Sequence, residues 1–272
     1  FMALSYWSIC NLTSRGEFLI MEKMTKEEII AFVKSQGADI CGIADLSDTN
    51  DYMKKLYGEY FSSFPRAVSF AIFYPKEVLQ RHIDTPTRDY LNTVNAINSE
   101  INRIVLKAAN VLERAGFRAF PIPASDNRPS VSTKGLHQKL AAAEDVSALP
   151  KIKQEIIGDF SHKLAAAKAG LGWVGKSCCI VNPQVGPRLR FGTILTDAPF
   201  EPDSEIPSKC GGCTKCRDIC PSGAIQGQAF NRDDELLKRF DAQKCSNYLT
   251  NLAGVFAPNS CGLCVAVCPW GK

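Results

Sequence analysis

Eight of the twelve cysteines lie between Cys210 and Cys268, in the last quarter of the chain. They follow two patterns, C-x2-C-x2-C-x3-C-P beginning at Cys210 and C-x2-C-x3-C-P beginning at Cys261, with Cys245 between them. Bacterial ferredoxins use the first pattern to hold two [4Fe–4S] clusters, because three of its thiolates bind one cluster and the fourth binds the other. The segment is therefore predicted to be a ferredoxin-like domain with two iron–sulfur clusters.

Two complete ligand sets follow from this pattern. The first set is Cys210, Cys213, Cys216 and Cys268, and the second is Cys220, Cys245, Cys261 and Cys264. Thiolates also suit zinc. Structural zinc, however, normally takes paired C-x2-C units that are separated by a dozen or more residues. Disulfides would require an oxidising compartment, and the N-terminal residues lack the basic flank of a signal peptide. The pattern favours clusters over both alternatives.

The rest of the chain alternates between helix and strand signals. With 272 residues and 45% hydrophobic content, the chain can bury one sizeable core and a smaller module. Apolar residues three or four apart predict a long helix over 88–116, and a capping box at 25–28 predicts another. Strands are predicted at 39–46, 66–74, 117–123 and 188–197. The expected fold class is α+β or α/β, divided into an extension at 1–20, a cofactor-binding domain at 21–202 and the ferredoxin-like domain at 203–272.

Composition excludes some functions. The net charge of +4 is only weakly basic and no dense Lys/Arg block occurs, so nothing in the charge argues for nucleic acid. No apolar run approaches the roughly 20 residues that span a bilayer. We expect a soluble, cytoplasmic protein without a membrane partner.

The stretch AGLGWVGKSCC, from Ala169 to Cys179, satisfies both the dinucleotide-binding pattern G-x-G-x-x-G and the phosphate-binding P-loop pattern. Both patterns require a strand before the glycines and a helix after them. Here a helix-like segment precedes the glycines, and the short strand-like run CCIVNP follows them. The carbonyl end of the incoming helix would repel phosphate. Neither nucleotide-binding interpretation is therefore favoured.

Other candidate residues have simpler interpretations. Cys41 on a predicted strand, and the adjacent Cys178 and Cys179, are expected to pack in the core, because both ligand sets are complete without them. The three histidines, His82, His137 and His162, have no second ligand at metal spacing and are expected at the surface. The polar segment 124–140 either covers a site or is mobile.

Several motifs together resemble the epoxyqueuosine reductases and, more distantly, the corrinoid iron–sulfur reductases that include reductive dehalogenases. These motifs are AGLGWVGK, FGTILTD, CGGCTKCRDICPSGAI, KCSNYLTNLAG and CGLCVAVCPW. The resemblance implies cobalamin beside two [4Fe–4S] clusters, with a glycine loop lining the cofactor cleft. It assigns to that cleft Gly170, Gly172, Trp173, Gly175, Lys176, Ser177, Phe191 and Thr196. The glycines would then let the backbone approach a large flat cofactor.

The chain departs from the family at two places. The family's proton-donor acid falls on Ile156, with Glu155 and Asp159 as neighbouring carboxylates, and the C-terminal helical repeats of many members do not follow the last motif. We therefore expect a cobalamin-dependent reductase that takes electrons from a ferredoxin or flavodoxin and acts on an unidentified small molecule. Two alternatives stay open. One is an electron-transfer protein that activates a partner corrinoid protein, and the other is an epoxyqueuosine reductase acting on tRNA.

Overall fold

The first described helix begins where the sequence specifies a cap. In the computed structural model, which describes residues 24–125, 160–256 and 260–271, α1 (Lys26–Ser35) follows Thr25. The Thr25 hydroxyl accepts the Glu28 N–H at 3.2 Å, and the Glu28 carboxylate accepts the Thr25 N–H at 2.8 Å. This confirms the predicted capping box. Ile29 and Val33 are fully buried and belong to one of the two cores.

A four-stranded sheet forms the centre of the N-terminal part. Its strands are β1 (Ile40–Asp45), β2 (Arg66–Phe73), β6 (Leu189–Thr196) and β3 (Ala119–Ile122), in that spatial order. Every neighbouring pair is antiparallel. The four predicted strands and the mixed helix–strand class are confirmed. The antiparallel pairing is typical of the α+β alternative, because βαβ crossovers would give parallel strands.

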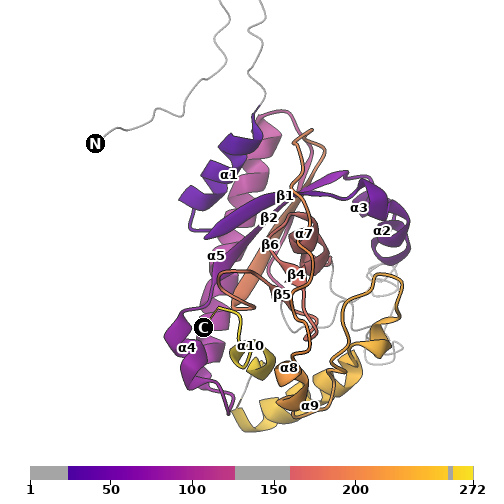
Figure 1. Cartoon of the computed structure of the whole chain (residues 1–272). Helices are drawn as coiled ribbons and strands as arrows, with labels where there is room; N and C mark the ends of the chain where they lie inside the picture. Colours follow the sequence, from indigo (N-terminus) through magenta and orange to yellow (C-terminus); the bar gives the residue numbers. More distant parts are fainter. Residues whose placement is uncertain (1–23, 126–159, 257–259, 272) are drawn as a thin grey trace, which may run out of the picture.

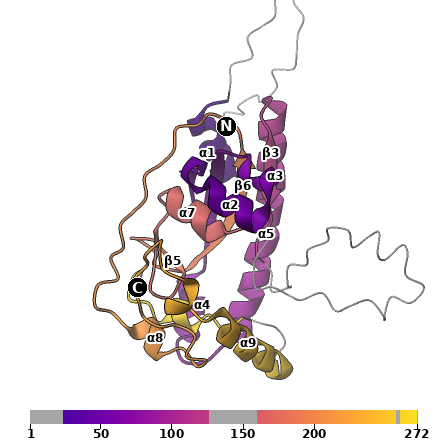
Figure 2. The same ribbon diagram turned by 90° about the vertical axis from the view of Figure 1, so that its right-hand side faces the viewer.

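Helices cover both faces of this sheet (Figures 1 and 2). The long helix α5 (Arg88–Arg114) and α1 lie on one face, where they bury an apolar core with the strands. On the other face α2 (Asn50–Tyr57) and α7 (His162–Lys168) bury a second core. Burial on both faces explains why the strands are apolar without a regular polar alternation.

The predicted long helix is confirmed as α5, which has 27 residues. Its buried positions include Val94, Ile97, Ile101, Ile104 and Ala108, the three-or-four spacing expected of an amphipathic helix. None of the helices in the described ranges combines the length and the apolar character needed to cross a membrane.

The cysteine-rich segment lies at one end of the sheet, beside α4 (Lys76–Arg81) (Figure 1). Its helices are short apart from α9, and turns connect them. The remaining elements are η1 (Ser47–Thr49), α3 (Glu59–Ser62), β4 (Trp173–Val174), β5 (Ile180–Val181), α8 (Lys215–Asp218), η3 (Leu236–Lys238), α9 (Ala242–Phe256) and α10 (Leu263–Ala266). Turns and short helices suit a segment whose structure depends on its ligands.

The segment 201–209, which we call the linker, joins the sheet to the cysteine-rich segment and contacts the edge of the sheet at Asp203. The Asp203 N–H donates to the carbonyl of Ile43 at 2.8 Å, and its carboxylate accepts the Ile43 N–H at 2.8 Å. The same carboxylate pairs with the Lys26 ammonium at 2.7 Å. The linker is thereby attached to β1 before the chain reaches the cysteines. A domain boundary near Pro202 stays a prediction.

Candidate iron–sulfur site

The structure brings the first predicted ligand set together; we call it the first cysteine group. Burial raises the pKa of the Cys216 thiol to about 11, and the neighbouring thiols of Cys210, Cys268 and Cys213 add to the rise. Cys216 lies on α8, whereas Cys268 follows α10. Four thiols from two separate turns therefore face one another.

The second predicted set, the second cysteine group, is also brought together. Burial raises the pKa of Cys245 to about 11, with further contributions from Cys220 and Cys261. Cys264 lies beside Cys261 and Cys245. This group joins α9 and α10 to the turn after α8.

The donor set fits iron–sulfur clusters better than single metal ions. All eight cysteines are free thiols. Among the described residues no three His, Cys, Asp or Glu side chains converge as ligands of one ion. Zinc would need four ligands within about 2.0–2.3 Å of one point. A cubane instead spreads its thiolates around a larger body, as the present arrangement does.

The glycine stretch forms a hairpin between β4 and β5. Its turn is closed by hydrogen bonds from Gly175 N to Cys179 O at 2.8 Å and from Cys178 N to Gly175 O at 2.9 Å. Helix α7 precedes this hairpin and no helix leaves its tip. The predicted helix-to-strand order is thus confirmed, and the tip has none of the helix N-terminal amides that a P-loop offers to phosphate.

The hairpin lies against the first cysteine group. The Trp173 indole N–H donates to the Cys210 sulfur at 3.4 Å, and the Lys176 ammonium donates to the Cys213 carbonyl at 3.3 Å. A hollow is lined by the hairpin tip from Gly175 to Ser177, by Val181, Lys215, Pro269 and Trp270, and by Cys264 and all four cysteines of the first group. Four of the residues assigned to a cofactor cleft therefore face the cysteines.

The glycines of this stretch are explained by contacts within the protein. Gly170 ends α7 at φ +66°, and a Cβ there would lie 2.5 Å from the Ser204 carbonyl oxygen. A Cβ on Gly172 would lie 2.5 Å from the Val181 carbonyl oxygen, and one on Gly175 would lie 2.7 Å from the Val181 side chain. These contacts give each glycine a packing reason within the protein, and their assignment to a cofactor cleft stays a prediction. Their missing side chains leave room for the linker at Gly170 and for β5 at Gly172 and Gly175.

The two remaining residues of the predicted cleft lie on β6. Phe191 pairs with Ala71 in the sheet and packs into the core on the α7 side. Thr196 is fully buried at the opposite end of β6, where its hydroxyl accepts the Ala198 N–H at 3.1 Å. Thr196 thus makes a hydrogen bond at the end of the strand, and its assignment to the cleft stays a prediction.

Several predictions lie outside the described residues. These are the carboxylates Glu155 and Asp159, the position Ile156, His137, and the part of segment 124–140 that follows Ser125.

Two histidines contradict the expectation that they lie at the surface. His82 is fully buried, its ring stacks on Tyr90 with centroids 4.2 Å apart, and it contacts the Cys261 carbonyl. Its Nδ1 accepts the Thr87 N–H at 3.0 Å. His82 thereby supports the loop that carries Cys261. No local pattern in the sequence signals this role, because the contact joins residues 179 positions apart.

His162 is also buried, between α7 and the sheet. Its Nε2 lies 2.8 Å from the Pro123 carbonyl, and its Nδ1 lies 2.8 Å from the Thr193 hydroxyl. A carbonyl can only accept, so Nε2 carries the proton and Nδ1 accepts from the hydroxyl. Burial lowers the pKa of His162 to about 4. The ring is therefore neutral and joins α7 to the sheet through its two hydrogen bonds.

The adjacent cysteines of the hairpin have different surroundings. Cys178 is buried as predicted, with its sulfur 3.9 Å from the Arg239 guanidinium and a left-handed φ of 58°. Cys179 instead lies beside Cys264 of the second cysteine group, and this neighbour is the main cause that lowers the pKa of Cys179 to about 6. Core packing is confirmed for Cys178, whereas Cys179 lies beside the predicted ligands. Cys41 packs against the core as expected.

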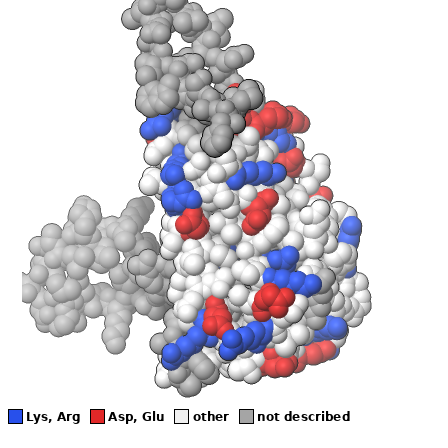
Figure 3. Space-filling model, turned by 90° about the vertical axis from the view of Figure 1, so that its left-hand side faces the viewer, with Lys and Arg blue, Asp and Glu red and all other residues white. Residues whose placement is uncertain are grey.

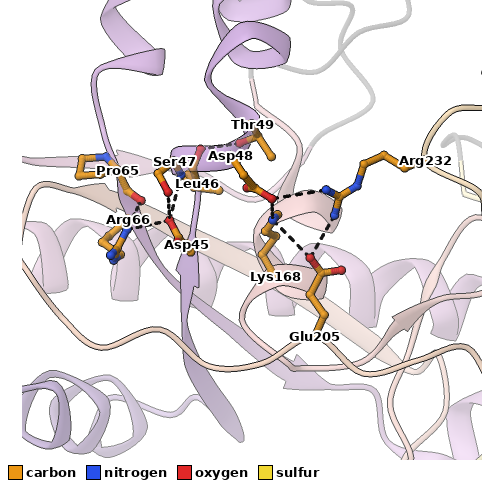
Figure 4. Close-up of polar contacts among 10 residues, drawn as sticks. All are labelled: Asp45, Leu46, Ser47, Asp48, Thr49, Pro65, Arg66, Lys168, Glu205 and Arg232. Atoms are coloured by element: carbon orange, nitrogen blue, oxygen red, sulfur yellow. Dashed lines mark hydrogen bonds and ion pairs between the residues drawn. The ribbon is translucent and has the colours of Figure 1, made fainter.

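A buried lysine connects four segments near the linker (Figure 4). The Lys168 ammonium at the end of α7 lies 2.5 Å from the Asp48 carboxylate and 3.3 Å from that of Glu205. Arg232 pairs with the same two carboxylates, at 3.4 and 3.1 Å. The Lys168 side chain is only 8% exposed, whereas its partners are about half exposed. This network ties the cysteine-rich segment to α7 and η1.

Comparisons with known proteins agree with this site. Residues 209–271 match the family described as "4Fe-4S double cluster binding domain". The chain is similar to the epoxyqueuosine reductase of Bacillus cereus, with 37% identity over 142 residues, which are 47% of this chain and 34% of that protein. The Bacillus subtilis enzyme of the same name is 34% identical over 126 residues, 42% of this chain and 30% of that protein. The chain thus matches about a third of these relatives' length.

Solved structures share the fold. A selenomethionine-labelled epoxyqueuosine reductase superposes with a TM-score of 0.53 at 24% identity, over 91% of this chain and 65% of that one. The catabolic reductive dehalogenase NpRdhA superposes with a TM-score of 0.62 at 21% identity, over 90% of this chain and 32% of that one. The resemblance predicted from the motifs is confirmed.

Proposed function

We propose that this chain is the electron-transferring core of an iron–sulfur reductase of the epoxyqueuosine reductase type. Cys210, Cys213, Cys216 and Cys268 would hold one [4Fe–4S] cluster, and Cys220, Cys245, Cys261 and Cys264 the other. The observation that carries this proposal is the gathering of eight free thiols into two groups of four. When bound, such clusters accept and release single electrons.

Protons compete with iron for the thiols of both cysteine groups. The raised pKa values of Cys216 and Cys245, both about 11, mean that these thiols hold their protons in the absence of iron. Cluster assembly must displace these protons, so loading weakens as the pH falls. The hairpin tip and Trp270 line a hollow with the first cysteine group, whose four cysteines are partly exposed.

We propose cobalamin as the electron acceptor, an expectation that rests on the sequence resemblance. Of the residues assigned to its cleft, Gly175, Lys176 and Ser177 line the hollow beside the first cysteine group, whereas Gly170, Gly172 and Thr196 contact protein atoms. No step is therefore assigned to it. A ferredoxin or flavodoxin as donor, and a small molecule as substrate, belong to the same proposal.

A second candidate function is electron delivery to a corrinoid on a partner protein. It fits the packing of Gly170 and Gly172 against protein atoms, since electron delivery to a partner needs no corrin contact at these glycines. A role on tRNA, as in the epoxyqueuosine reductases, is a third candidate, and the face in Figure 3, where positive and negative side chains are interspersed, offers no basic patch for it. Nucleic acid is usually bound by a basic patch.

Iron and sulfide analysis after anaerobic purification tests the proposal. We expect about eight irons and about eight acid-labile sulfides per chain. Cys216→Ser and Cys245→Ser should each remove about four irons, whereas Cys41→Ser, on β1 and outside both groups, should retain all of them. Zinc in place of iron would overturn the proposal. Stoichiometric cobalamin uptake by the loaded protein would favour the reductase over the electron-delivery alternative.

A further inference from the structure

One hydrogen bond links the hairpin directly to a predicted cluster ligand. The Trp173 indole Nε1 lies 3.4 Å from the Cys210 sulfur. An indole nitrogen is a donor only, so the direction of the bond is fixed. Trp173 is 2% exposed, and water therefore has little access to compete for this proton.

The surroundings hold the indole in place. Trp173 pairs with Val181 across the hairpin, and the preceding Gly172 has no room even for a methyl group against the Val181 carbonyl. The Trp270 ring packs edge-on against the indole, with centroids 5.0 Å apart and planes at 81°. A donor that is fixed in this way needs no reorganisation when the charge on the sulfur changes.

We infer that the Trp173 indole N–H raises the reduction potential of the first cluster through its hydrogen bond to Cys210. One-electron reduction adds negative charge that is shared by the thiolate sulfurs. A donor to such a sulfur stabilises the reduced state more than the oxidised state. The inference rests on the proposed clusters. In it, Trp173 sets the reduction potential of the first cluster relative to that of the second.

Trp173→Phe tests this role, because phenylalanine keeps an aromatic ring but lacks the N–H. We expect the midpoint potential of the first cluster to become more negative in an anaerobic redox titration followed by electron paramagnetic resonance. The second cluster should be unchanged and serves as an internal control. Cys216→Ser, which removes a first-cluster ligand, identifies which transition belongs to that cluster.

Trp270→Phe is the matched control. It loses an indole beside the same cysteine group, but no hydrogen bond from the Trp270 indole to a cysteine is found among the described residues. Because phenylalanine keeps a ring against the Trp173 indole and leaves the Trp173–Cys210 hydrogen bond in place, the midpoint potential of the first cluster should shift much less than in Trp173→Phe. An unchanged midpoint in Trp173→Phe, or an equal shift in both variants, would overturn the inference.

A second measurement detects the hydrogen bond directly in the wild-type protein. In wild-type protein labelled with 15N-tryptophan, electron–nuclear double resonance of the reduced first cluster should show coupling to an indole nitrogen. The coupling should vanish in Trp173→Phe and persist in Trp270→Phe. If iron analysis finds no clusters, the proposed function fails as well. If clusters are present without coupling or shift, the inference alone fails.

Discussion

Replacing Gly172 by alanine should destabilise the protein even without any bound organic cofactor. A Cβ at this position would lie 2.5 Å from the Val181 carbonyl oxygen and 2.8 Å from the Ile180 side chain. Ordinary contacts begin at 3.4 Å. The carbonyl belongs to the paired backbone of β5, so it cannot rotate away as a side chain could. The hairpin must open instead.

The size of the effect follows from this geometry. Moving backbone by roughly 0.9 Å in a packed region costs about 1–3 kcal/mol of unfolding free energy. The smaller conformational entropy of the unfolded alanine chain offsets about 0.4–1 kcal/mol of this cost. The net loss of about 1–2 kcal/mol corresponds to a thermal midpoint lower by about 2–8 °C for a chain of this size.

Anaerobic thermal unfolding at a fixed scan rate, followed by far-ultraviolet circular dichroism, measures this loss. Gly254→Ala is the matched control, because Gly254 lies in α9 with no atom within 4 Å of the new Cβ. Alanine there should stabilise the helix by about 0.5–1 kcal/mol. The two substitutions therefore shift the midpoint in opposite directions.

An unchanged midpoint for Gly172→Ala, together with weaker cobalamin uptake, would refute this reasoning. It would mean that the glycine faces a cofactor and that β5 does not limit the space. A lower midpoint in protein free of cobalamin supports the packing explanation.

Two further predictions concern buried ionisable side chains. Burial lowers the folded-state pKa of His162 from 6.5 to about 4. The free energy of unfolding should therefore be highest above pH 6.5. It should fall by roughly 3 kcal/mol as the pH approaches 4, because protonation then favours the unfolded state. The thermal midpoint should fall less steeply over this range in His162→Gln, and an equally steep fall would contradict the assignment. Lys168→Met should lower the unfolding free energy by about 1–3 kcal/mol, because Asp48 and Glu205 lose the buried ammonium and keep only Arg232 as a cation partner. Lys54→Met, at an exposed ion pair, should change it by less than about 1 kcal/mol in the same measurement.

The sequence by itself determined the main strands, two helices and the two groups of cysteines. The capping box at Thr25, the apolar period of α5 and the cysteine spacings are local patterns, and each acts through residues a few positions apart. Helix formation and the convergence of consecutive thiolates depend mainly on such neighbours. For this reason the strands, the long helix and the two cysteine groups were predictable.

Tertiary structure alone decided the antiparallel strand order and the residues that support the site. His82 contacts Cys261 across 179 positions, and Trp173 reaches Cys210 across 37. The glycines at 170 and 172 meet Ser204 and Val181 through the packing of α7 and the hairpin. These contacts depend on how distant segments pack. In a packed interior they are fixed by the fit of side chains and by the need to pair buried polar groups. Neither requirement leaves a periodic pattern in the sequence.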